Sequence, residues 1–87
     1  MKPRKTRPRN LRALDAIIRF QVSSPDSTRV SEMIQGGSFL QHEIKNSNSA
    51  VAEMEKKYIF FADEAATARK LVSRGQPCIF NVYFREP

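Results

Sequence analysis

Residues 63–85 read DEAATARKLVSRGQPCIFNVYFR, and within this stretch the hydrophobic period changes from that of a helix to that of a strand. The first half predicts a helix over 64–74, which Asp63 caps and Gly75 ends. Its buried stripe consists of Ala65, Ala68, Leu71 and Val72. The second half predicts a strand that opens at Pro77 and has an alternating inward set, Cys78, Phe80, Val82 and Phe84. Its outward set is Ile79, Asn81, Tyr83 and Arg85.

Three upstream segments are predicted to be strands, two of them from the same alternation. In residues 14–22 the apolar side chains fall on even positions, with Ile17 as the exception. A helix starting at Asn10 is the rival reading, but it would leave Phe20 on the polar side, so the strand is preferred. Residues 38–45 also alternate, and residues 58–62 are predicted to form a short aromatic strand.

The segment after the first strand predicts a helix. Ser24 suits the cap, Pro25 the first helical position, and Asp26 the positive end of the dipole. One helical face would carry Val30, Met33 and Ile34, and Gly36-Gly37 would end the helix.

A turn is predicted at 46–49, where Asn and Ser alternate. Residues 50–57 fit either a short helix capped by Ser49 or an extension of the next strand into a long hairpin, and the hairpin is preferred.

The predicted order is β-α-β-β-α-β, the ferredoxin-like arrangement of an antiparallel sheet with two helices on one face. We therefore expect an α+β fold with two parts: a flexible basic arm over 1–12, disordered by itself, and a single domain over 13–87.

The charge supports this division. The net charge of +6 comes from an N-terminal group of cations, Lys2, Arg4, Lys5, Arg7, Arg9 and Arg12, with no acid before Asp15. Residues 13–87 hold nine basic and nine acidic residues. A basic segment on a neutral domain predicts a polyanionic partner, and nucleic acid is preferred over an anionic protein, a membrane surface or a merely solubilising tail.

Groups for catalysis are scarce. His42 is the only His and Cys78 the only Cys, so we expect no metal site, no cofactor, no small-molecule substrate and no enzymatic activity. His42 is interpreted as a hydrogen-bonded structural or edge-strand residue, and a nucleophilic pair with Cys78 is disfavoured. The single Cys favours a cytoplasmic protein, and no apolar run is long enough to span a membrane.

The remaining candidate surface is the sheet face that the helices leave open. Aromatic and Arg side chains on such a face suit single-stranded nucleic acid, because bases stack on rings while phosphates meet cations. RNA-recognition-motif domains use this topology, but residues 57–62, KYIFFA, lack the glycine of that family's third-strand signature, and no membership is predicted.

The sequence thus predicts a small non-enzymatic protein that binds RNA or single-stranded DNA. The candidate binding residues are the six cations of the arm together with Arg19, Tyr58, Phe60, Tyr83 and Arg85. The alternative is a protein-interaction or inhibitor module that dimerises or docks through its apolar sheet face.

Overall fold

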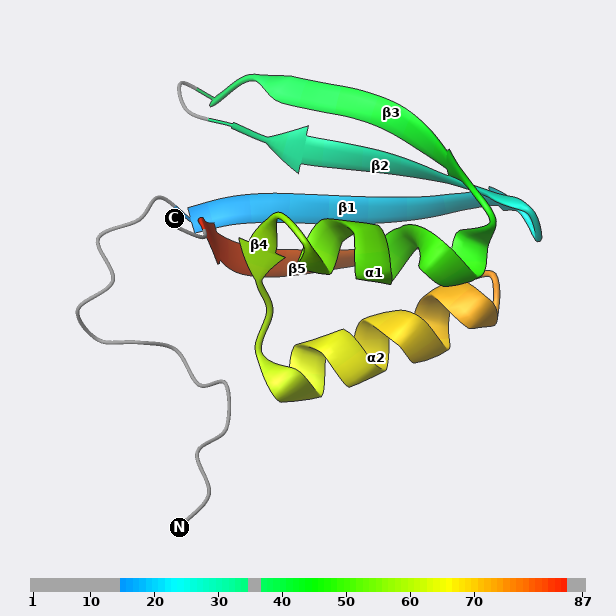
Figure 1. Ribbon diagram of the computed structural model, residues 1–87. Helices are drawn as coiled ribbons and strands as arrows, with labels where there is room; N and C mark the ends of the chain where they lie inside the picture. The colour runs from blue at the N-terminus through cyan, green and yellow to red at the C-terminus, as the bar shows by residue number, and fades with distance from the viewer. Residues whose placement is uncertain (1–14, 35–36, 85–87) are drawn as a thin grey trace, which may run out of the picture.

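The computed structural model describes residues 15–34 and 37–84 as an α+β fold (Figure 1). Its strands are β1 Asp15–Ser24, β2 Ser27–Met33, β3 Phe39–Lys45, β4 Tyr58–Ile59 and β5 Cys78–Phe84. Its helices are α1 Ala50–Glu55 and α2 Ala62–Ser73. The strands form one sheet in the order β3-β2-β1-β5-β4, with every neighbouring pair antiparallel. The expected α+β class and antiparallel sheet are confirmed.

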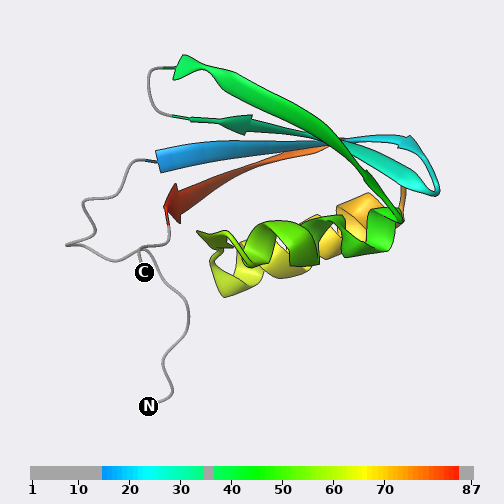
Figure 2. The ribbon, with the colours of Figure 1, turned by 45° about the horizontal axis from the view of Figure 1, so that its top comes forward.

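The sheet is curled, and both helices lie against one of its faces (Figures 1 and 2). The core fills the space between these two layers. The central strands contribute Ile18, Phe20, Val30 and Val82, and the helices contribute Val51, Met54, Ala68 and Val72. The rings of Phe20 and Phe80 meet edge to face with their centroids 6.1 Å apart. We call the other side of the sheet the open face.

The alternation in β1 sorts its side chains between these two faces. Ala16, Ile18 and Phe20 are buried toward the helices, whereas Arg19 and Gln21 are exposed on the open face. The strand predicted over 14–22 is therefore confirmed for the described residues 15–22, and it continues to Ser24.

The helix predicted after Ser24 is wrong, because residues 27–33 form β2. Pro25 and Asp26 make the turn between β1 and β2, a use of these residue types as common as helix initiation. Tertiary pairing on both sides of β2 then stabilises the extended backbone more than its local helical signals stabilise a helix. Gly37, expected to help end that helix, instead lies in the β2–β3 connection with φ of +81°.

The observed order is consequently β-β-β-α-β-α-β, and the ferredoxin-like order is not observed. The preferred hairpin over 50–57 is also wrong. Residues 50–55 form α1, because Ala50, Val51 and Met54 lie on one side of a helix and are all buried there. Ser49 occupies its N-cap position, but its hydroxyl makes no capping hydrogen bond.

The clearest predicted helix is confirmed with shifted ends. α2 begins at Ala62, so Asp63 lies in its first turn and Phe61 takes the N-cap position. At the other end the Gly75 N–H donates to the Val72 carbonyl and the Gln76 N–H to the Leu71 carbonyl, which is a Schellman cap.

The strand predicted over 58–62 is shortened to Tyr58–Ile59, and the last strand is confirmed. The proposed arm, residues 1–12, lies outside the described residues. In the described part of the chain, neither helix has the length and apolar character needed to cross a membrane.

Candidate nucleic-acid interface

The open face is built from pairs of residues that lie directly opposite each other on neighbouring strands. Arg19 on β1 is aligned with Ile79 on β5 and with Ser31 on β2, and Ser31 is aligned with Gln41 on β3. Opposed residues of antiparallel strands point to the same side, so these four side chains form one row across the open face. A second row consists of Gln21, Arg29 and Glu43.

Arg19 and Phe39 are in direct contact on this face. The guanidinium carbon of Arg19 lies 5.5 Å from the centroid of the Phe39 ring, within the range of a cation–π interaction. Arg19 belongs to β1 and Phe39 to β3, so the Arg19 side chain crosses β2 over the small residue Ser31. Phe39 keeps 45% of its surface exposed.

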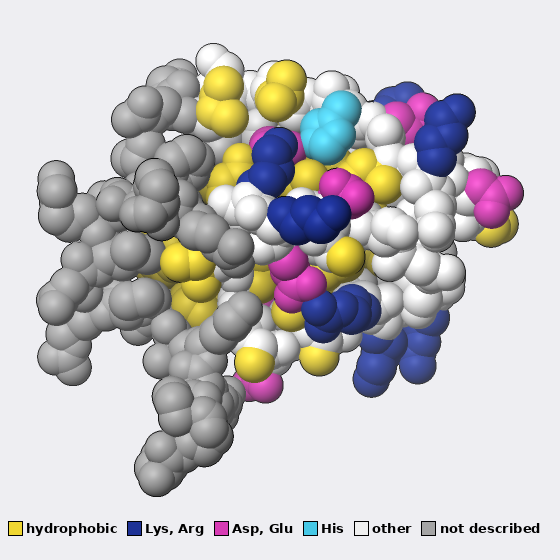
Figure 3. Space-filling model, viewed as in Figure 1, with side chains coloured by type: hydrophobic (Ala, Val, Ile, Leu, Met, Phe, Trp, Pro, Cys, Tyr) yellow, Lys and Arg dark blue, Asp and Glu magenta, His cyan; other side chains and the backbone are white. Residues whose placement is uncertain are grey.

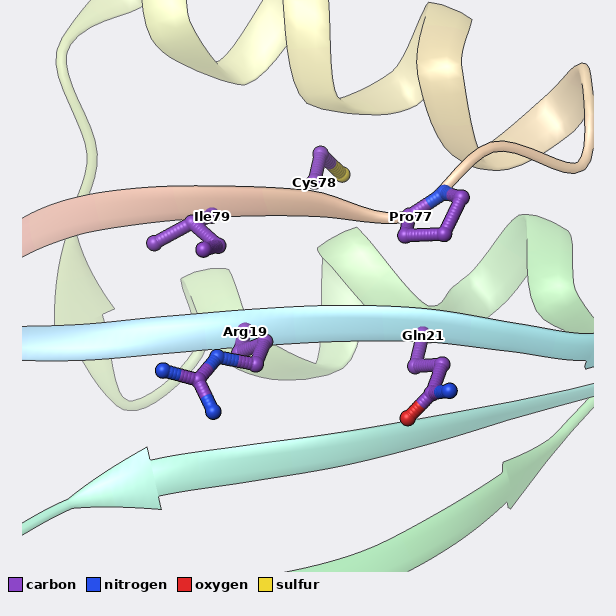
Figure 4. A pocket seen from close by; sticks show the side chains of 5 residues that line it. All are labelled: Arg19, Gln21, Pro77, Cys78 and Ile79. Carbon is purple, nitrogen blue, oxygen red and sulfur yellow. The ribbon is translucent and has the colours of Figure 1, made fainter.

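A hollow lies next to this contact, between β1 and β5 (Figure 4). Arg19, Gln21 and Ile79 project on one side of the strands, whereas Cys78 points toward the helices. Ile79 is 59% exposed, and burial raises the pKa of the Cys78 thiol to about 11. The hollow therefore offers an apolar side chain, an amide and a guanidinium, with the thiol kept protonated at neutral pH.

Two of the predicted binding aromatics are placed elsewhere. Tyr58 and Phe60 are buried in the core on the helix side of the sheet and offer no ring to a base. The prediction placed both on a strand over 58–62, but β4 is a two-residue edge strand that contains only Tyr58. Tyr83 is only 9% exposed, and its ring meets that of Phe61 edge to face at 5.8 Å.

Of the predicted cations, the structure describes only Arg19 at the interface. Arg85 and the six basic residues of the arm lie outside the described residues. The described part of β1 begins at Asp15, which is aligned with Tyr83. Phe39 belongs to the same end of the sheet, because its partner Met33 is the last residue of β2 and β2 runs antiparallel to β1. Asp15, the first described residue, thus lies at the same end of the sheet as the contact of Arg19 with Phe39.

Sequence reasoning missed Phe39, Arg29 and Gln41 as members of this face. Their strands pair with each other, and the helix predicted after Ser24 conceals this pairing. The available signal was the alternation of Thr28, Val30 and Glu32 with Arg29 and Ser31. Glu32 weakens this alternation, because it is a charged residue at a position where the pattern calls for a buried apolar one.

Glu32 is the centre of a second polar site, on the helix side of the sheet. Its side chain is 1% exposed. The Tyr58 hydroxyl donates to Glu32 Oε1 at 2.7 Å, His42 Nε2 lies 2.6 Å from Oε2, and Lys57 Nζ donates to Oε2 at 3.3 Å. The interpretation of His42 as a hydrogen-bonded structural residue agrees with this geometry.

The electrostatics of Glu32 and Tyr58 follow from these contacts. Burial acts to raise the pKa of Glu32, but the hydrogen bonds from Tyr58, His42 and Lys57 together outweigh it and hold the pKa below the usual value. Burial, and then the adjacent carboxylate, raise the pKa of Tyr58. Glu32 is therefore ionised and Tyr58 neutral at pH 7.

A nucleophilic pair of His42 and Cys78 is excluded by the sheet. Cys78 is aligned with Phe20, Phe20 with Val30 and Val30 with His42, so three strand spacings, or about 14 Å, separate the two residues. Within residues 15–34 and 37–84, no group of three or more His, Cys, Asp and Glu residues could hold a metal ion. In the view of Figure 3, acidic and basic side chains alternate over the described surface rather than forming one patch.

No family model matches this sequence, and neither the curated proteins nor the solved structures contain a significant match to it.

Proposed function

We propose that this protein binds single-stranded nucleic acid, RNA or single-stranded DNA, without catalysing a reaction on it. The observation that carries the proposal is the contact of Arg19 with the half-exposed ring of Phe39 on the open face. Guanidinium planes and aromatic rings are the surfaces on which proteins stack unpaired bases. The same face carries three exposed amide side chains that can hydrogen-bond to base edges, those of Gln21, Gln41 and Asn81.

The open face supplies stacking, and the basic segment supplies attraction for phosphates. Residues 13–87 are electrically neutral, so the domain by itself attracts a polyanion only weakly. Six cations precede Asp15, and neutralising six phosphates of a single strand gives a log–log salt slope of about −4. The arm would thus determine the salt dependence of binding, and the face would determine the preference for unpaired bases.

Fluorescence anisotropy with labelled single-stranded RNA, single-stranded DNA and a matched duplex tests this division. Deleting residues 1–12 should flatten the salt slope toward zero. Phe39→Ala should weaken single-strand binding by about 1–3 kcal/mol without changing the slope, because it removes a stacking surface and no charge. Arg19→Gln should weaken binding more than its matched control Arg74→Gln, which removes one positive charge from the exposed end of α2.

Absence of binding at low salt would refute the proposal, as would equal effects of Arg19→Gln and Arg74→Gln combined with no effect of Phe39→Ala. The exposed Ile79 favours a second candidate function, docking of a protein on the same face. Ile79→Lys separates the two. An added cation should leave nucleic-acid affinity unchanged or raise it, whereas it should abolish an interface that buries Ile79.

A further inference from the structure

The outer edge of β3 has no strand partner within residues 15–34 and 37–84. Two backbone bonds identify its outward groups. Just before β3, the Ile34 N–H donates to the Ser38 carbonyl at 2.8 Å. Just after β3, the Asn46 N–H donates to the Asp26 carbonyl at 2.5 Å. Bonded and non-bonded pairs alternate in an antiparallel ladder, so the even residues of β3 bond to β2. The N–H and C=O groups of the odd residues point outward: Phe39, Gln41, Glu43 and Lys45.

The backbone of this edge has no interruption that would block pairing. β3 is aligned with β2 without interruption over all seven residues, and it contains neither a proline nor a bulge. Edge strands are commonly shortened, bent or interrupted, and β4 at the opposite edge is only two residues long. Apolar side chains also gather at this edge, because Leu40 is 50% exposed and Ile34 and Phe39 lie beside it, each 45% exposed.

The sequence of β3 is complementary to itself in one antiparallel register. Centring two copies on His42 aligns the whole strand, so that every outward residue of one copy meets an outward residue of the other. Leu40 then lies opposite Ile44, and Gln41 lies opposite Glu43. A register centred on Glu43 would oppose two carboxylates, and one centred on Gln41 would place Leu40 against His42 and leave Lys45 without an opposite residue in β3.

We propose that the partner of this edge is a second copy of the chain, bound by antiparallel pairing of β3 with β3 about His42. The two five-stranded sheets would then be continuous, with the helices of both copies on one side and both open faces on the other. Leu40 of each copy would be covered by Ile44 of the other. This dimer is independent of the proposed function, because its formation requires no nucleic acid.

Sedimentation equilibrium of the full chain without nucleic acid tests the proposal. The average mass should rise with concentration from 10.0 kDa toward twice that value. Gln41→Pro should weaken the dimer about tenfold or more, because it deletes one inter-chain N–H donor from each copy. Within one chain this proline is tolerated, since the Gln41 N–H does not bond to β2. Gln41→Thr is the matched control, because it changes the same side chain, keeps the N–H and should leave the dimer intact.

A cysteine at the centre of the pairing tests the register. His42 is the only residue that would face itself, at a Cα separation of about 4.5 Å, which is within the range of a disulfide. Under mild oxidation His42→Cys should therefore form a covalent dimer faster than Gln41→Cys, whose two copies would be offset diagonally. The unsubstituted chain under the same oxidant is the control for any disulfide formed by the native Cys78, which is buried.

Either of two results would overturn the proposal. One is the mass of a single chain at every concentration, which would leave the edge free for a different partner. The other is a dimer that Gln41→Pro leaves intact while circular dichroism confirms that the variant is folded. In that case loss of the dimer in Ile79→Lys would place the contact on the open face instead.

Discussion

The Glu32 carboxylate lies between the sheet and the α1–β4 connection, where an unpartnered charge would strongly destabilise the fold. Three donors surround it, and they come from β3, β4 and the residue before β4. The cluster therefore ties the β2–β3 hairpin to the connection that leads to α2. Because this hairpin reaches beyond the helices (Figure 1), the carboxylate supplies a contact that the apolar core does not.

Glu32→Gln should destabilise the protein by about 1–3 kcal/mol at pH 7, because it removes the ionic partner of Lys57 and His42. The folded pKa of Glu32 is lower than its ordinary value of 4.5, so ionisation favours the folded state. This contribution is fully present above about pH 4.5 and is lost as the pH falls through the folded pKa. Urea denaturation across this pH range should show the gap between the two proteins closing toward acid. A constant gap would contradict the prediction.

Thr28 differs from Glu32, because its buried polar atom has no hydrogen-bond partner among the described residues. Its side chain is fully buried between Val22 and Ile44. Thr28→Val keeps the shape and the preference for a strand while it removes the hydroxyl. It should stabilise the fold by about 1 kcal/mol in urea denaturation. Thr67→Val, at an exposed site on α2, is the control that should show no such gain.

Among the elements, α2 has the most local determinants. Gly75 adopts φ of +80° at its C-terminal cap, and a Cβ added there would meet no atom within 4 Å. Gly75→Ala should therefore cost about 1 kcal/mol through backbone strain alone, without a steric clash. Gly75→Asn should cost less, because Asn tolerates the left-handed region better. Equal thermal stability of all three proteins would show that the cap does not limit the stability of the fold.

The same distinction between local and distant causes explains which elements could be predicted from sequence. α2 and β5 are specified by their own periodicity and by Gly75 and Pro77, and both were predicted. The 24–34 segment has helical spacing at Val30, Met33 and Ile34, yet residues 27–33 form a strand because β1 and β3 pair with them. Such pairing joins residues that are distant in the sequence, so no local pattern predicts it.

The candidate site was predicted only in part for the same reason. Arg19 could be placed on the open face from the alternation of β1 alone. Its partner Phe39 could not, because their contact requires β2 to lie between their strands as a third strand. Tyr58 and Phe60 were misplaced because the sequence of a two-residue edge strand resembles the start of a longer strand.

At the scale of the whole molecule, the two helices do not cover the full width of the sheet. β1 and β2 are paired with a strand on both sides over most of their length, whereas β3 lies at an edge whose residues are mostly exposed. Amide hydrogens of β1 and β2 should therefore exchange with solvent most slowly, because most of them are bonded inside the sheet and their release requires it to open. Those of β3 should exchange faster by opening of the edge alone.

Within β3 the exchange rates should alternate with residue number. In dilute solution, where single chains prevail, the amides of Gln41 and Glu43 should exchange rapidly, because they point away from the sheet and bond to no described residue. The amides of Leu40, His42 and Ile44 should be protected by their bonds to β2. Raising the concentration should slow exchange at the two odd positions and leave the even ones unchanged, since only the odd amides gain acceptors from a second β3. Hydrogen exchange followed by NMR resolves these amides individually. Protection that rises equally at odd and even positions would indicate association through another surface that merely stabilises the hairpin, because an edge-to-edge contact can bond only the groups that face outward.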